Sequence, residues 1–314
     1  MLHLIYARSL VIFFALPLAL IAACSGTSLD LPPVTGDNSG QRHPGKFIWH
    51  DLISDTPAAS RDFYSQLLGW SFSRLPTSIA DYWVISHAGI PIGGMVDQAS
   101  LSTERDVSQW VSLLSVDSAQ QARDRVVAAG GTVLREPVSL GRRGTVAVFA
   151  DAQGGIFASL ETLAGDPDDS SGLAPEGSFF WHELWTGQVD AAASFYAALS
   201  GLDIEALPGM SVDRGVEFRV LRDEGKVRAG IRSLPLTDMP TMWMPYLRVA
   251  SESRLRILLE RVTALGGQVL VPAIARPAGG FVAVIAGPSG APVALQSWDE
   301  SMSRSDVNQG TSDA

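Results

Sequence analysis

The sequence is poor in cysteine and in positive charge, and each shortage excludes a class of function. Cys24 is the only cysteine among 314 residues, so the chain can form no disulfide within itself. It carries 23 lysines and arginines against 33 acidic residues, a formal net charge of −10. Nucleic-acid binding needs a basic stripe that neutralises backbone phosphates. We therefore expect no nucleic-acid partner. We expect the adjacent Arg142 and Arg143 to be solvated loop residues, with an anion clamp as the alternative.

Long apolar runs are also scarce, and the main one lies near the start of the chain. Residues 9–23 are apolar, but the run contains Pro17 and is shorter than the roughly 20 residues that a membrane-spanning helix needs. It ends in Ile21-Ala22-Ala23-Cys24, which resembles the lipobox of bacterial lipoproteins. The resemblance implies a signal peptide over residues 1–23 and a Cys24 whose thiol takes a diacylglyceryl group.

An acylated Cys24 would bind membrane lipid, because each buried methylene of the acyl chains contributes about 0.8 kcal/mol. The expected location is then the cell envelope, on the extracytoplasmic side of a membrane, and the outer membrane if the organism has one. An ordinary signal peptide or an uncleaved anchor stays open as the alternative.

Three segments are rich in small and polar residues and poor in large apolar side chains. Such a composition buries too little apolar surface to order a chain. It predicts a flexible tether over 24–44, a linker over 164–177 and a disordered tail over 299–314. Two modules of ordinary domain size remain, at 45–163 and 178–298.

The two modules are copies of one another. Phe47–Ser54 (FIWHDLIS) matches Phe179–Thr186 (FFWHELWT) at an offset of 132, as from Trp49 to Trp181. Further along, residues 144–148 match residues 280–284 at an offset of 136. Two copies of about 120 residues indicate a duplicated domain and are too few and too long for a solenoid.

The periodicities within the first copy predict two consecutive βαβββ units. Pro57 favours a helix start and Gly69 a helix end. The first unit comprises a strand at 46–53, a helix at 57–68 and strands at 70–75, 82–86 and 91–97. The second comprises a strand at 110–116, a helix at 118–129 and strands at 132–135, 144–150 and 156–161.

These motifs, in this order, resemble the vicinal oxygen chelate superfamily, which includes glyoxalase I, bleomycin-resistance proteins and extradiol dioxygenases. The resemblance is carried by four features: Trp-His-acid-Leu in the first strand, the helix motif at 58–64, Val-Asp-Ser-Ala at 116–119, and Asp-Ala-Gln-Gly at 151–154. It implies an α+β fold of two tandem glyoxalase-like modules. In each, a pair of βαβββ units forms a curved mixed sheet around a cavity.

Metal-dependent members of this superfamily bind a divalent ion through four His, Glu or Gln side chains on the inner strand faces. The resemblance places those positions at Trp49, Gly94, Val111 and Ala158 in the first module and at Trp181, Gly230, Met244 and Ala294 in the second. None of these side chains can coordinate a metal. We therefore expect no cofactor. A divalent metal would need His50 and His182 to enter through a one-residue bulge.

Asp51 and Glu183 are the candidate catalytic residues, because an acid recurs at this position in both copies. Neighbouring side chains of a strand point to opposite faces, so if Asp51 faces the cavity with Trp49, His50 points towards the helix. A carboxyl in an apolar cavity should have a raised pKa and can act as a general base or as a hydrogen-bond donor. A fixed hydrogen bond to the neighbouring backbone is the alternative.

Six tryptophans on predicted strands are candidate ligand-binding residues, as flat surfaces on which a ring can stack. They are Trp49, Trp83, Trp110, Trp181, Trp185 and Trp243. Core packing is the alternative role for each of them.

The sequence thus predicts a lipid-anchored protein that binds a small hydrophobic or aromatic molecule in metal-free cavities. An enzyme of the same superfamily, a lyase, isomerase or dioxygenase that uses Asp51 or Glu183 with or without a metal, is the alternative. A structural or partner-binding part of an envelope assembly is the third possibility.

Overall fold

The computed structural model describes residues 29–76, 81–169, 172–206, 216–236, 238–277 and 279–298. The expected signal peptide, Cys24 and the C-terminal tail lie outside these ranges. Within them, no helix has the length and apolar character needed to cross a bilayer.

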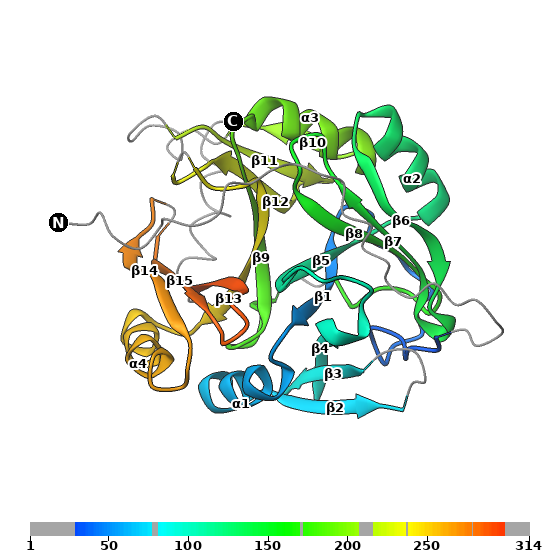
Figure 1. Cartoon of the computed structure of the whole chain (residues 1–314). Helices are drawn as coiled ribbons and strands as arrows, with labels where there is room; N and C mark the ends of the chain where they lie inside the picture. Colours follow the sequence, from blue (N-terminus) through cyan, green and yellow to red (C-terminus); the bar gives the residue numbers. More distant parts are fainter. Residues whose placement is uncertain are drawn as a thin grey trace.

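Each half of the chain forms one eight-stranded sheet with two helices, in the expected order βαβββ-βαβββ (Figure 1). The first module contains β1 (Phe47–Ser54), α1 (Pro57–Leu68), β2 (Ser71–Leu75), β3 (Tyr82–His87), β4 (Ile90–Asp97), β5 (Gln109–Ser115), α2 (Ala119–Ala128), β6 (Thr132–Ser139), β7 (Gly144–Ala150) and β8 (Ile156–Thr162). The second contains β9 (Phe179–Thr186), α3 (Val189–Ser200), β10 (Asp203–Glu205), β11 (Phe218–Asp223), β12 (Lys226–Ser233), β13 (Met242–Val249), α4 (Glu252–Val262), β14 (Gln268–Ala275), β15 (Phe281–Ala286) and β16 (Pro292–Ser297).

The two sheets share one strand order, β2-β3-β4-β1-β5-β8-β7-β6 and its equivalent β10-β11-β12-β9-β13-β16-β15-β14. The antiparallel pair β1/β5 joins the two units of the first module, and β9/β13 does the same in the second. We call the side of each sheet away from its helices the inner face. Strand alternation places Trp49 and Asp51 on the inner face and His50 and Leu52 on the helix side.

Helix boundaries follow local chemistry. Pro57 opens α1, and Gly69 closes it with a φ of 74°, a left-handed conformation that costs glycine nothing. Ser118 and Ser251 cap α2 and α4 by accepting a bond from a backbone N–H of the first turn.

The helix sides of the two modules pack against each other crosswise, with α1 beside α4 and α2 beside α3 (Figure 1). Phe149 and Phe157 of the first module share a core with Phe195 and Tyr196 of the second. The other core combines α1 with β13, α4, β15 and β16. Each unit therefore buries its apolar helix side against the other module, and neither core belongs to one module alone.

The expected flexible tether over 24–44 is wrong from residue 29 onward. Leu29, Leu31 and Val34 are buried against the inner face of the first sheet, with 2% of Leu31 exposed. Leu31 N donates to Leu140 O at 2.9 Å, and Arg143 Nε donates to Pro32 O at 3.0 Å. Composition alone missed this segment because three apolar side chains are enough to cover a strip of sheet that would otherwise contact water.

The described part of the expected linker is also fixed, by its acidic side chains. Asp166 is 2% exposed and accepts bonds from His43 N and Thr162 Oγ1 at 2.7 and 2.8 Å. Asp169 forms ion pairs with Lys46, Lys226 and Arg228, which come from both modules. Burial raises the pKa of Asp169, but these three cations outweigh it and hold the pKa well below its usual value.

Candidate functional site

The inner face of the first sheet carries a polar cluster around Asp51. Trp49 Nε1 and Tyr82 OH donate to Asp51 Oδ1 at 2.9 and 2.8 Å. Arg143 donates to Tyr82 OH at 2.6 Å, and its guanidinium lies 4.4 Å from the Trp49 ring centre. Arg143 is only 1% exposed, so the expected solvated loop arginine is instead buried as the cation of this cluster.

The Asp51 carboxyl has the raised pKa that the sequence predicts, but few other side chains near it could take part in a reaction. Burial raises its pKa, and the charge of Arg143 offsets part of that effect. Asp51 keeps part of its surface exposed, whereas Trp49, Tyr82 and Arg143 are buried beneath residues 29–34. The chain's own segment therefore covers most of the face where a substrate would lie.

Glu183, the equivalent acid on the second inner face, is fully buried and accepts bonds at both oxygens. Trp181 Nε1 and Arg276 donate to Oε1 at 3.0 and 2.5 Å. Tyr246 OH and Trp185 Nε1 donate to Oε2 at 2.5 and 3.4 Å. Glu183 is 0% exposed, and its two oxygens accept four bonds from described side chains.

The electrostatics of Glu183 contradict the expectation of a raised pKa. Burial raises the pKa of Glu183, but the guanidinium groups of Arg276 and Arg232 outweigh burial and lower it to about 2. A carboxylate with so low a pKa and four donors around it is a weak base. The geometry makes Glu183 a fixed counter-ion that orients the surrounding side chains.

The Trp–acid pair is repeated in the two modules, but its supporting tyrosine is not. Tyr82 comes from β3, whereas Tyr246 comes from β13. The arginines come from equivalent connections, since Arg143 lies between β6 and β7 and Arg276 lies between β14 and β15. They do not match at the offsets of 132 and 136, so a search at those offsets does not find them. The available signal was that a buried acid requires a cation nearby.

The positions that hold a metal in metal-dependent relatives face inward in both modules. Asp51 lies opposite Gly94 and Val111 in the sheet, and Leu113 lies opposite Trp49 and Ala158. A Cβ on Gly94 would collide with Tyr82 and Asp51, so neighbouring side chains already fill that position. Among the described residues, no group of three or more His, Cys, Asp or Glu side chains is placed to hold a metal. The residues at these positions therefore do not fit the metal centre.

His50 and His182 lie between the modules and away from both inner faces. Their Nε2 atoms are 2.6 Å apart, and the His50 ring stacks on Phe179 at 3.8 Å. The β1 register does shift, but between Phe47 and Trp49, so His50 stays on the helix side. The alternative assignment of these histidines as metal ligands in the cavities is therefore wrong.

Both histidines are neutral in the fold. Burial lowers the pKa of His50 to about 3 and holds the pKa of His182 well below its usual value. A neutral pair can share one hydrogen bond between the two Nε2 atoms, with one ring as donor and the other as acceptor.

The structure divides the six candidate tryptophans into two groups. Trp49, Trp181 and Trp185 lie on the inner faces. Trp110 and Trp243 lie on the helix sides, because they stand opposite Leu52 and Leu184 in their ladders, and they pack in the shared cores. Trp83 also points to the helix side, with the Arg61 guanidinium 4.8 Å from its ring centre.

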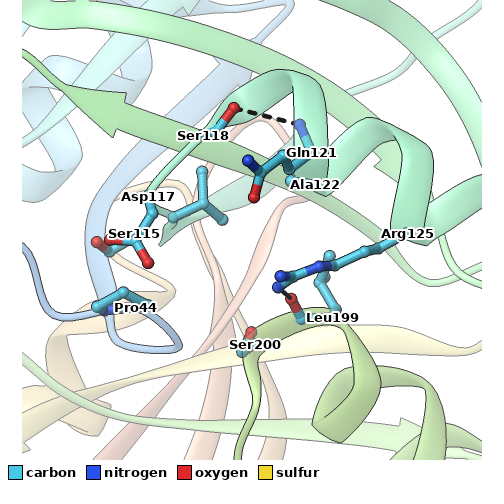
Figure 2. Close-up of a pocket in the computed structure, with 10 residues that line it drawn as sticks. Pro44, Ser115, Asp117, Ser118, Gln121, Ala122, Arg125, Leu199 and Ser200 are labelled. Carbon is cyan, nitrogen blue, oxygen red and sulfur yellow. Dashed lines mark hydrogen bonds between the residues drawn. The ribbon is translucent and has the colours of Figure 1, made fainter.

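Two hollows in the described structure lie outside the inner faces. One, between α2 and α3, has a volume of about 40 Å³, enough for water only. Figure 2 shows Arg125 reaching across it to Leu199, whose carbonyl accepts at 2.9 Å. The other is an open groove of about 700 Å³ along α1, β2 and β3, lined by Arg61, Arg74 and Trp83.

The inner face of the second sheet differs from the first in how well it is covered. Of the described residues there, five hydrophobic ones are buried and eight more are only partly buried, among them Trp181, Met242 and Val282. On the first face sixteen described hydrophobic residues are buried, and three of these come from the segment 29–34. The second face therefore presents aromatic and apolar side chains around the fixed Glu183 cluster.

Comparison with known proteins agrees with this fold. Residues 48–159 match the glyoxalase-like domain family. The chain is 26% identical over 246 residues to the putative glyoxylase CFP32 of Mycobacterium tuberculosis, covering 77% of this chain and 91% of that protein. It is 31% identical over 176 residues to the anthracycline biosynthesis protein DnrV of Streptomyces peucetius, covering 51% and 62%.

Solved structures give the same fold at low sequence identity. The Mn(II)-bound glyoxalase from Novosphingobium aromaticivorans superposes with a TM-score of 0.56 at 18% identity, covering 81% of this chain and 82% of that one. A catechol 2,3-dioxygenase superposes with a TM-score of 0.55 at 13% identity, covering 82% and 89%. Residues 48–159 thus match a glyoxalase-like domain by sequence, and the two modules together have the fold of these glyoxalase and extradiol dioxygenase structures.

Proposed function

We propose that the chain is a lipid-anchored binding protein that holds a small hydrophobic or aromatic molecule on the inner face of its second module. One observation carries the proposal: eight partly buried hydrophobic side chains surround a fixed polar cluster on that face, which has no metal-donor set at the superfamily's positions. Binding sites of this kind are mostly apolar with a few placed polar groups. The anthracycline biosynthesis relative supports an aromatic ligand.

The second inner face is the better candidate of the two because its partly buried residues remain reachable. On the first face, Leu29, Leu31 and Val34 take the place that a ligand would occupy. Glu183 serves to orient Trp181, Trp185 and Tyr246 by accepting a bond from each of them. This role needs a permanently charged carboxylate and no proton transfer.

The binding test uses purified protein, a panel of bicyclic and polycyclic aromatic compounds, and calorimetric titration. Met242→Trp places a larger side chain on the second inner face and should weaken binding at least tenfold. Val127→Trp, on the exposed side of α2, adds the same side chain far from that face and should leave binding unchanged. Failure of every compound to bind, or equal binding by both variants, would contradict the proposal.

The membrane part of the proposal rests on Cys24 and its lipobox-like context. Cells labelled with a palmitate analogue should yield a labelled protein in the membrane fraction. Cys24→Ser should abolish both the labelling and the recovery of the protein in the membrane fraction. If the Cys24→Ser protein still associates with the membrane, the proposed lipid anchor is wrong.

A further inference from the structure

The Glu183 cluster on the second inner face holds two cations and one acid. Arg276 and Arg232 both lie within 4.0 Å of the Glu183 carboxylate. Arg228, on the same side of β12 as Arg232, is paired with Asp169 and Asp223 instead. Arg276 is 7% exposed and bonds both Glu183 and Gln296 Oε1, so it neutralises the carboxylate. Arg232 is then a second cation beside one acid. In the corresponding cluster of the first module, Asp51 and Arg143 balance one to one.

Arg232 lies at the edge of the polar cluster, and its guanidinium has an N–H donor without an acceptor. It lies on β12 opposite Trp185, and its guanidinium is 5.9 Å from that ring centre. Its nearest approach to Glu183 is 4.0 Å, too long for a hydrogen bond. Its Nε is buried, and no described atom accepts a bond from it. The side chain as a whole is 24% exposed, so a ligand on this face can reach it.

The geometry points to an anionic ligand: we propose that the molecule bound on the second inner face carries an acidic oxygen, as in an aromatic carboxylate, that pairs with Arg232. Guanidinium groups bind carboxylates through two parallel hydrogen bonds. The ring of the same molecule would lie against Trp181, Trp185 and the apolar residues around them. This inference rests on the proposed function and adds the charge of its ligand.

A pair of probes that differ only in charge tests it: 2-naphthoate, an anion, and 2-naphthamide, its neutral counterpart. In calorimetric titrations at pH 7, the wild-type protein should bind the naphthoate at least tenfold more tightly than the amide. Arg232→Gln should lower naphthoate affinity at least tenfold, or about 1.4 kcal/mol, and leave amide affinity unchanged.

Arg219→Gln is the matched control, because it removes the same charge from the neighbouring strand β11. Arg219 is paired with Asp190 of α3 at 2.9 Å, on the helix side of the same sheet. It should bind both probes as the wild-type protein does. Two outcomes would overturn the anionic ligand without contradicting the binding site. One is equal affinity of the wild-type protein for the two probes, and the other is an equal loss of naphthoate affinity in the two variants. Absence of binding by either probe, with no other aromatic compound bound, would overturn the proposed function itself.

Discussion

The buried histidine pair should make stability depend steeply on pH between 6.5 and 5. The pKa of His50 is about 3 in the fold, that of His182 is well below its usual value, and both are 6.5 in the unfolded chain. Between these values the unfolded chain binds protons that the folded chain does not bind. The stabilisation is therefore fully present above pH 6.5 and is lost as the pH falls.

The magnitude follows from the number of protons. Each histidine contributes at most about 1.4 kcal/mol per pH unit, so the pair contributes at most about 2.7 kcal/mol per unit, a slope that is reached well below pH 6.5. Because the unfolded histidines are only half protonated at pH 6.5, the loss between pH 6.5 and 5 should be about 3 kcal/mol, a large fraction of the stability of an ordinary domain. The lowered pKa of Glu183 acts in a separate range, since that stabilisation is lost only as the pH falls from 4.5 towards 2.

Urea unfolding of three proteins at pH 7, 6 and 5 measures this slope. His182→Gln keeps an amide beside His50 Nε2 and removes one titrating group, so its slope should fall to about 1.4 kcal/mol per unit. Ser112→Ala is the control, because Ser112 is buried, lies opposite His50 in the β1/β5 ladder and does not titrate. If wild type and His182→Gln lose stability in parallel, the histidines are not the source of the pH dependence.

Three further predictions concern other parts of the fold. Leu31→Ala should lower the free energy of unfolding by about 3 kcal/mol, because it empties a fully buried position, whereas the exposed Leu163→Ala should change it by less than about 0.5 kcal/mol in the same urea assay. Gly94→Ala should lower the melting temperature by several degrees because of the collision of its Cβ, and Gly36→Ala, which has open space around it, should not. Asp169→Asn should lower the free energy of unfolding at pH 7 because it weakens three ion pairs. Below the usual carboxyl pKa, the free energy of unfolding of the variant should fall less steeply with pH than that of the wild type. Identical acid unfolding curves for the two proteins would contradict the role of these ion pairs.

The fold was predictable because it depends on local patterns that recur along the chain. Pro57 and Gly69 fix the ends of α1, and the structure gives that helix the predicted bounds of 57–68. The duplicated βαβββ order follows from strand-length apolar runs and their turn residues, which act over a few residues at a time. Information of this kind is present in any single stretch of sequence.

The site was harder to predict because it depends on contacts between distant residues. Alternation along β1 and β9 correctly separates Asp51 and Glu183 from the adjacent histidines. It gives no information on Arg276, which lies 93 residues from Glu183 and determines its ionisation. The meeting of His50 with His182 depends likewise on how two modules pack, which no pattern within one module encodes.

If Cys24 is acylated as proposed, the packing of the chain at Leu29 limits how far the protein can stand from the membrane. Four residues lie between Cys24 and Leu29, so the two positions are at most about 18 Å apart in an extended chain. The part of the first sheet that holds Leu29 would then stay within this distance of the lipid surface. Molecules leaving the bilayer would then meet the protein at a fixed height and in a restricted orientation.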